Sequence, residues 1–129
     1  MIVLDTHVLI WWVANPKKLS REVRKSIKEE KEGILVSSIS VWEIYLLVKK
    51  GRLKLTIDVD SWLAKVESLP LIRFVPVNNR IAAKSVNLPE KFHQDPADRI
   101  IVATARDLGA TLLTNDQRIR KYSHVQTLW

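Results

Sequence analysis

Short apolar segments along the chain alternate with longer segments whose apolar residues recur at helical spacing. The short segments are rich in aliphatic residues, are bounded by polar, glycine or proline residues, and lie at 2–4, 34–36, 71–77, 111–114 and, more weakly, 125–128. Apolar runs of this length are typical of strands that are buried on both faces, as in a parallel sheet. The pattern therefore predicts four strands and a short fifth one.

The segments between these strands have the start and stop signals of helices. Residues 6–14 are nearly all apolar and end at Asn15-Pro16, which predicts a buried helix. Ser20 can cap a helix that runs to Glu32, with basic residues on one face and apolar residues on the other. Further helices are predicted at 40–50, from a cap at Asp60 or Ser61 to about 69, at 78–86 and 96–108, and as a turn at 116–121.

Strands that alternate with helices predict a parallel sheet with right-handed crossovers. We therefore expect a three-layer α/β/α fold with a central parallel sheet of four to five strands. At 129 residues, the chain fits a single domain spanning 1–129. Its longest wholly apolar stretch, 8–14, is too short to span a membrane, and Asp5 argues against a signal peptide, so we expect a soluble, cytoplasmic protein without membrane contact.

Five acidic residues should meet at one edge of this sheet. Asp5 and Asp116 directly follow strands, and Glu43 opens the helix after the second strand. Asp95 and Asp98 begin a helix that must finish at the opposite edge in order to enter the fourth strand. Because the carboxyl ends of parallel strands share one edge, where open α/β sheets bind their ligands, these acids are predicted to line a common crevice.

Composition and charge limit the kinds of metal ligand and partner that such a crevice can have. The chain has no cysteine, so a metal must be held by oxygen or imidazole, and 21 Lys and Arg against 14 Asp and Glu favour a polyanionic partner such as nucleic acid. Two carboxylates roughly 5 Å apart repel by about 3 kcal/mol at an effective dielectric near 20. Mg²⁺ or Mn²⁺ would remove this repulsion, and an oxygen-ligated cation in a basic domain indicates phosphodiester chemistry.

Each acid also has a structural explanation. Ser40 and Glu43 match a capping box, Asp95 is a good cap before a proline, and Asp98 would meet the helix dipole. Asp116 could cap the last helical turn. Caps, however, do not need to share a crevice, so the predicted topology favours a functional cluster while the structural explanations stay open.

The segments LDTH (4–7), SVWE (40–43), HQDPADR (93–99) and TND (114–116) resemble motifs of the PIN-domain nucleases, in particular the VapC-type toxins of toxin-antitoxin pairs. Their order and spacing cover essentially the whole chain. The resemblance implies a PIN-like fold and an endoribonuclease that depends on Mg²⁺ or Mn²⁺. It also implies a homodimer whose activity on RNA is blocked by a small cognate antitoxin.

The resemblance implies roles for individual residues. The catalytic and metal-binding set would be Asp5, Glu43, Asp98 and Asp116. Supporting polar residues would be Thr6, Asp95, Thr114 and Asn115. On charge alone, the candidate contacts to RNA phosphates are Arg99, Lys49 and Arg52, with the basic face of 17–28 as a further surface. The chain departs from related sequences at Ala97, where Phe is frequent, and at His7, where Ser or Asn is frequent.

Two other functions agree with parts of the sequence. A catalytically silent PIN-like module would keep the fold and bind RNA or a partner, although the presence of all four acids argues against a dead site. A phosphatase of the aspartyl-phosphate kind also places an Asp after its first strand, but it requires a second Asp two positions later, where this chain has His7. The histidines are interpreted as packing or loop residues.

Overall fold

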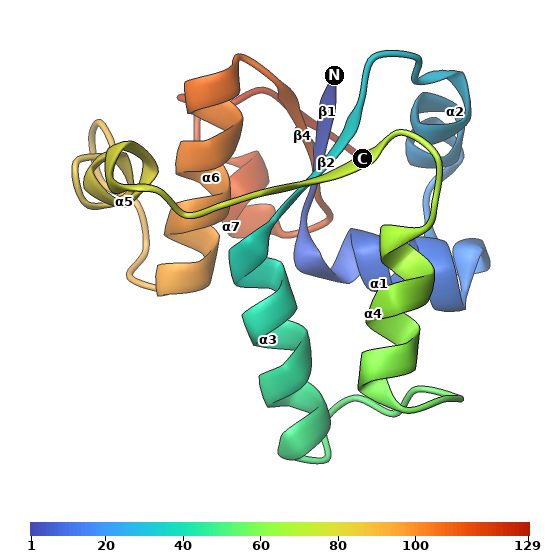
Figure 1. The fold of residues 1–129 in the computed structure, drawn as a ribbon. Coiled ribbons are helices and arrows are strands. Elements are labelled where there is room, and N and C mark those ends of the chain that lie inside the picture. The colour runs from blue at the N-terminus through green and yellow to red at the C-terminus, as the bar shows by residue number, and fades with distance from the viewer.

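The computed structural model describes the whole chain, residues 1–129, and contains one parallel sheet with helices on both faces (Figure 1). Its strands are β1 (Ile2–Leu4), β2 (Ile34–Ser37), β3 (Ile72–Val75), β4 (Thr111–Leu113) and β5 (Thr127–Leu128), in the order β3-β2-β1-β4-β5. All four strand pairs are parallel. The predicted three-layer α/β/α fold with four to five parallel strands is confirmed.

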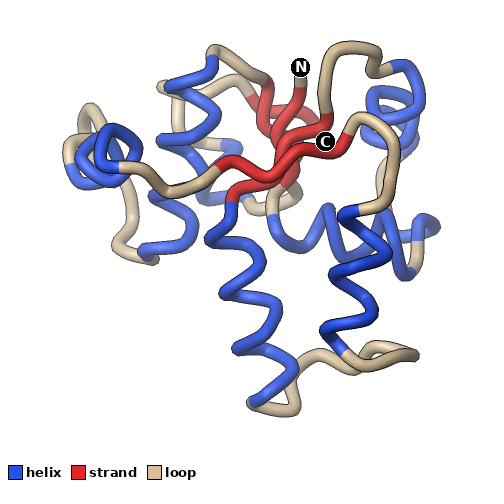
Figure 2. The backbone as a smooth tube through the Cα atoms, viewed as in Figure 1, coloured by secondary structure: helices blue, strands red, loops and turns tan.

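The helices are α1 (Thr6–Ala14), α2 (Arg21–Glu29), α3 (Ser38–Lys49), α4 (Val59–Glu67), α5 (Asn79–Val86), α6 (Pro96–Leu108) and α7 (Gln117–Arg120), and a 3-10 turn, η1, covers Pro16–Lys18. Figure 2 shows how these helices surround the central strands. None of the helices is both long and apolar enough to cross a membrane.

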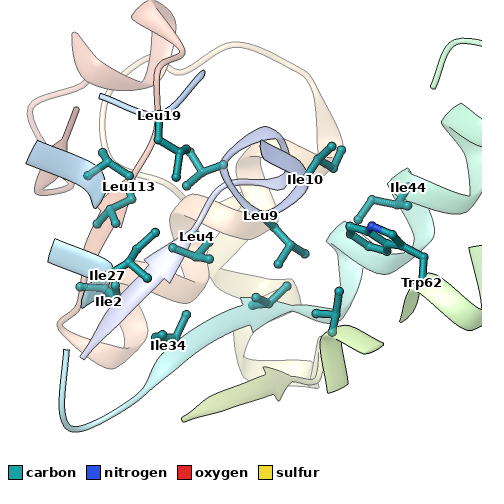
Figure 3. Close-up of a cluster of buried hydrophobic side chains, with 14 residues drawn as sticks. Ile2, Leu4, Leu9, Ile10, Leu19, Ile27, Ile34, Ile44, Trp62 and Leu113 are labelled. Atoms are coloured by element: carbon teal, nitrogen blue, oxygen red, sulfur yellow. The ribbon is translucent and has the colours of Figure 1, made fainter. Parts of the chain in front are cut away.

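Successive side chains of the central strands point to opposite faces of the sheet and pack against different helix layers. Ile2 and Leu4 of β1 join a core cluster with residues of α1, α2 and α4, which Figure 3 shows. Val3, between them, joins Leu112 of β4 in a second cluster with residues of α5, α6 and α7. Because both faces of β1 are covered, all three of its residues are buried, which explains the continuous apolar run in the sequence.

Helices α3 and α4 extend beyond the sheet as a two-helix arm (Figure 1). Ile44 of α3 and Trp62 of α4 are buried against each other in the seam of this arm (Figure 3). The chain enters α3 at the carboxyl end of β2, so the turn after Lys49 lies at the far tip of the arm. Lys49 and Arg52 are therefore remote from the carboxyl edge of the sheet.

The start of α3 differs from the prediction. Ser37 is the N-cap, and its Oγ accepts a hydrogen bond from the backbone N–H of Ile39 at 3.2 Å. Ser40 consequently lies inside the helix and is fully buried. The predicted capping box between Ser40 and Glu43 is wrong, because the helix is capped three residues earlier, by Ser37.

Two other helix ends also differ because of side-chain caps. The Glu30 carboxylate accepts hydrogen bonds from the N–H groups of Glu32 and Gly33 at 2.8 and 3.0 Å, so α2 ends at Glu29 and not at Glu32. Asp58, rather than Asp60 or Ser61, caps α4. In contrast, α6 has the predicted bounds, and Gly109 after it adopts the left-handed conformation, with φ +62°.

Candidate active site

Acidic side chains from four parts of the chain lie at the carboxyl edge of the sheet. Asp5 connects β1 to α1, Glu43 lies in α3, Asp98 lies in the first turn of α6, and Asp116 precedes α7. The structure brings these four side chains into one pocket of about 270 Å³, which is also lined by His7, Trp11, Asp95, Asn115 and Arg118.

Asp5 is held rigidly at the base of the pocket. Its side chain accepts hydrogen bonds from the Thr6 N–H at 2.8 Å and from the Thr114 hydroxyl at 2.7 Å. The Thr114 Oγ1 in turn accepts the N–H of Asp116 at 3.1 Å, so one hydroxyl orients two of the acids. Burial raises the pKa of Asp5, and the hydrogen bonds from Thr114 and Thr6 oppose this shift only in part.

A buried hydroxyl pair connects α1 to α3 behind Glu43. Thr6 donates a hydrogen bond to Ser40 Oγ at 2.8 Å, and both residues are almost wholly buried. Ser40 lies one helical turn before Glu43 and therefore fixes how α3 presents the carboxylate. Burial raises the pKa of Glu43, and the charges of Asp5 and Asp95 raise it further. The sequence predicts Ser40 as a helix cap and gives no sign of this positioning role.

Asp98 is strongly disfavoured as an anion. It is only 7% exposed, and burial together with the charges of the surrounding acids, Asp5 first, raises its pKa to about 8. Nε2 of His93 lies 3.2 Å from Asp98 Oδ2. The Nδ1 atom of His93 accepts the N–H of Asp95 at 3.3 Å, which leaves Nε2 to carry the proton of a neutral ring.

Arg118 supplies the positive charge of the pocket and was not predicted from the sequence. Its Nη2 atom lies 3.0 Å from Asp116 Oδ2 and 3.4 Å from Asp98 Oδ2. Although burial acts in the opposite direction, the hydrogen bonds and charge of Arg118 lower the pKa of Asp116. The only sequence signal was a cation two residues after an acid in a helical turn.

Asp95 has the capping role that the sequence left open. Its Oδ1 atom accepts the N–H groups of Ala97 at 3.0 Å and Asp98 at 3.4 Å. The Asp95 side chain also lines the pocket, as does Asn115. Asp95 thus fixes the first turn of α6 and, with it, the position of Asp98.

Arg99, a candidate for a phosphate contact, bonds to the protein backbone in this structure. Its guanidinium donates four hydrogen bonds of 2.9–3.2 Å to the backbone carbonyls of Ser85, Val86, Phe92 and His93. These bonds join the end of α5 to the loop before α6, so the role of Arg99 is structural. Lys49 and Arg52 also lie outside the pocket, and the basic face of α2 lines a separate hollow.

The donor atoms of the pocket fit a hard divalent cation. The acidic side chains offer only oxygen. Burial first, and the negative charge of neighbouring acids second, raise the pKa values of Asp5, Glu43 and Asp98, so a bound cation would offset an unfavourable charge. With the side chains in their present positions, no group of three or more His, Asp or Glu residues forms a ready metal site. Arg118 and His93 instead provide the groups that contact Asp98.

A parallel sheet between two helix layers, with acids from four elements at its carboxyl edge, defines an α/β protein with a carboxylate-lined ligand pocket. The family model described as PIN domain matches residues 2–125. Ribonuclease VapC22 of Mycobacterium tuberculosis is 38% identical over 130 residues, which cover 99% of this chain and 98% of the relative. The chain belongs to the PIN-domain family and is similar to its VapC members, as the motifs indicated.

Solved structures agree with this assignment at the level of the fold. A DNA-bound VapBC from Salmonella typhimurium superposes with a TM-score of 0.71 at 18% identity, covering 99% of this chain and 98% of the other. A toxin-antitoxin complex from Klebsiella pneumoniae gives a TM-score of 0.67 at 21% identity, covering 97% and 95%. The three-layer architecture is therefore shared over essentially the full length.

Proposed function

We propose that this chain is a metal-dependent endoribonuclease that hydrolyses RNA phosphodiester bonds and acts as the toxin of a toxin-antitoxin pair. The observation that carries the proposal is the pocket in which Asp5, Glu43, Asp98 and Asp116 converge. The similarity to Ribonuclease VapC22 supports the reaction, and the fold shared with toxin-antitoxin proteins supports the biological role.

The four acids would hold Mg²⁺ or Mn²⁺ through their carboxylate oxygens. When bound, such an ion supplies positive charge to the phosphodiester and the acidity that makes a water molecule nucleophilic. Thr114 and Thr6 keep the Asp5 carboxylate oriented, and Asp95 keeps Asp98 at the start of α6. These fixed contacts let the chain present its carboxylates without reorganising the backbone.

The proposed partners follow from the same pocket. RNA is the substrate, and a small cognate antitoxin is the inhibitor. A cluster of carboxylates attracts a basic side chain, as the contacts of Arg118 with Asp98 and Asp116 illustrate within this chain, and an antitoxin could exploit that attraction. The homodimer implied by the resemblance and the cytoplasmic location expected from the sequence stay predictions.

Replacing Asp5 with Asn is expected to lower RNA cleavage by about a thousandfold, because loss of a ligand charge removes several kcal/mol of metal-dependent stabilisation. Cleavage of RNA should be measured with Mg²⁺, with Mn²⁺ and after addition of EDTA. Glu22→Gln removes one charge from an exposed position on α2 and serves as the control. Full, EDTA-sensitive cleavage by Asp5→Asn would show that the assignment is wrong.

Thermal melting separates the nuclease from the catalytically silent alternative. A protein that binds Mn²⁺ in its folded state should melt at a higher temperature when the ion is added. A module that had lost its metal site should melt at the same temperature with and without Mn²⁺ and should cleave no RNA. An increase in the midpoint that Asp5→Asn abolishes would assign the ion to this pocket.

Replacing Arg118 with Ala is expected to strengthen Mn²⁺ binding in the absence of RNA. The guanidinium contacts two proposed ligands, so the ion must compete with it for Asp98 and Asp116. The guanidinium is largely exposed, and its removal should lower the Kd for Mn²⁺ by about fivefold, equivalent to about 1 kcal/mol. Calorimetric titration measures the change, and Arg120→Ala on the same helix is the control; unchanged or weaker binding would contradict the prediction.

A further inference from the structure

A second hollow adjoins the acidic pocket and shares Arg118 with it. The hollow has a volume of about 240 Å³ and is lined by residues 90–93, Arg118 and residues 121–123. His93 forms part of its wall and also lies 3.2 Å from Asp98 of the acidic pocket. The loop before α6 and the end of α7 therefore bound both depressions.

The sign of the charge reverses between the two hollows. The acidic pocket contains five carboxylates and one guanidinium, whereas the second hollow contains Lys91, Arg118 and Lys121 with Glu90 as its single acid. Glu90 lies 3.3 Å from Nε2 of His124. Lys91 and Lys121 are exposed and make no ion pair or side-chain hydrogen bond within the protein, so their ammonium groups are free to bind an external anion.

The floor of this cationic groove is rigid. Tyr122 donates a hydrogen bond from its hydroxyl to the carbonyl of Pro89, and its ring lies 4.7 Å from that of Phe92. Arg99 donates hydrogen bonds to the backbone carbonyls of Phe92 and His93. Glu90 has a φ of +56°, a conformation that a non-glycine residue keeps only where its surroundings fix it. The loop therefore presents Lys91 from a fixed backbone.

We propose that Lys91, Arg118 and Lys121 bind the RNA backbone next to the bond that is cleaved. The inference rests on the proposed ribonuclease function and deepens it by naming the path of the substrate. An RNA whose scissile phosphate enters the acidic pocket carries further phosphates on either side, and uncompensated carboxylates repel them. The two free lysines, together with Arg118, offset this repulsion beside the pocket, and contacts to phosphates position the strand without reading its sequence.

The other basic surfaces are less suited to this task. Lys49 ends α3 and Arg52 lies in the turn that follows, at the far tip of the α3 and α4 arm (Figure 1). The basic face of α2 lines a hollow that has no residue in common with the acidic pocket. Unlike these two surfaces, the groove of Lys91, Arg118 and Lys121 adjoins the proposed reaction centre and shares a basic side chain, Arg118, with it.

The test compares two double variants that remove the same charge. Lys91→Ala/Lys121→Ala removes both free lysines from the groove. Lys31→Ala/Lys65→Ala removes two exposed lysines elsewhere, one from the segment before β2 and one from α4. Binding of a short unstructured single-stranded RNA should be measured by fluorescence anisotropy in EDTA over a range of salt concentrations. The groove variant should bind about tenfold more weakly at low salt, with a salt slope smaller by about 1.4, which corresponds to two phosphate contacts on a single strand.

The control variant should keep the affinity and slope of the unsubstituted protein, and all proteins should share one melting temperature. The inference is overturned if the groove variant keeps its affinity and slope, if both double variants lose affinity equally, or if the unsubstituted protein does not bind the RNA at low salt. Cleavage with Mg²⁺ or Mn²⁺ is measured in parallel. Cleavage by the unsubstituted protein together with any of these results refutes the groove alone, whereas absence of cleavage refutes the ribonuclease function.

Discussion

Replacing Asp98 with Asn is expected to stabilise the metal-free protein and, at the same time, to abolish RNA cleavage. Asp98 is almost wholly buried, and Asp5, Asp95, Asp116 and Glu43 each raise its pKa. Asn has nearly the same shape but no charge, so it removes repulsion from the folded state. It also removes a proposed metal ligand, so cleavage should fall by about a thousandfold.

The stabilising effect should depend on pH in a defined direction. The pKa of Asp98 is 3.8 in its ordinary state and about 8 in the folded protein. Between these values the folded state binds more protons than the unfolded state, so the stability of the parent protein falls as the pH rises from about 4 to about 8. The amide introduced by Asp98→Asn does not titrate, and the advantage of this variant should therefore grow over this range and stay constant above it.

Thermal melting in EDTA from pH 5 to pH 9 measures this difference. At the upper end, Asp98→Asn should melt at least about 3 °C above the parent, which corresponds to about 1 kcal/mol for a domain of this size. Glu22→Gln, an exposed charge change, should melt like the parent at every pH. A lower melting temperature for Asp98→Asn at pH 9, or cleavage at the parental rate, would contradict the proposed role of this residue.

Replacing Arg99 with Ala is expected to lower the free energy of unfolding by about 3 kcal/mol, because four backbone carbonyls lose charge-assisted hydrogen bonds. Arg99→Lys should recover little of this loss, since an ammonium group cannot reproduce the fork of the guanidinium. Urea unfolding of both variants, with Arg120→Ala as the control, measures the effect.

The same experiment distinguishes the structural role of Arg99 from the phosphate contact suggested by its charge. A phosphate contact would tolerate Lys in the folded protein and would leave urea unfolding unchanged. Parental stability in Arg99→Lys would therefore restore the sequence-based interpretation. Loss of stability would also loosen the loop that presents Lys91, so RNA binding should weaken as a consequence.

Local signals were sufficient wherever the cause of a structure lies within a few residues. The apolar runs at 2–4 and 34–36 form buried strands, and α6 begins after its Asp95 cap and ends before Gly109, as predicted. It was harder to predict which of several neighbouring polar residues caps a helix. Ser37 and Asp58 are caps that the apolar periodicity did not distinguish from their neighbours, because several polar residues near each helix start can accept the same N–H group.

The order of apolar and polar segments was enough to predict the alternation of strands and helices, and hence the sheet edge at which Asp5, Glu43, Asp98 and Asp116 lie. Which side chains contact these acids became known from the packed fold. Thr114 bonds Asp5 across 109 positions of the chain, Thr6 bonds Ser40 across 34, and Arg118 reaches Asp98 across 20. Periodicity fixes the face on which a residue lies, whereas such contacts depend on the relative placement of whole elements by the packed core.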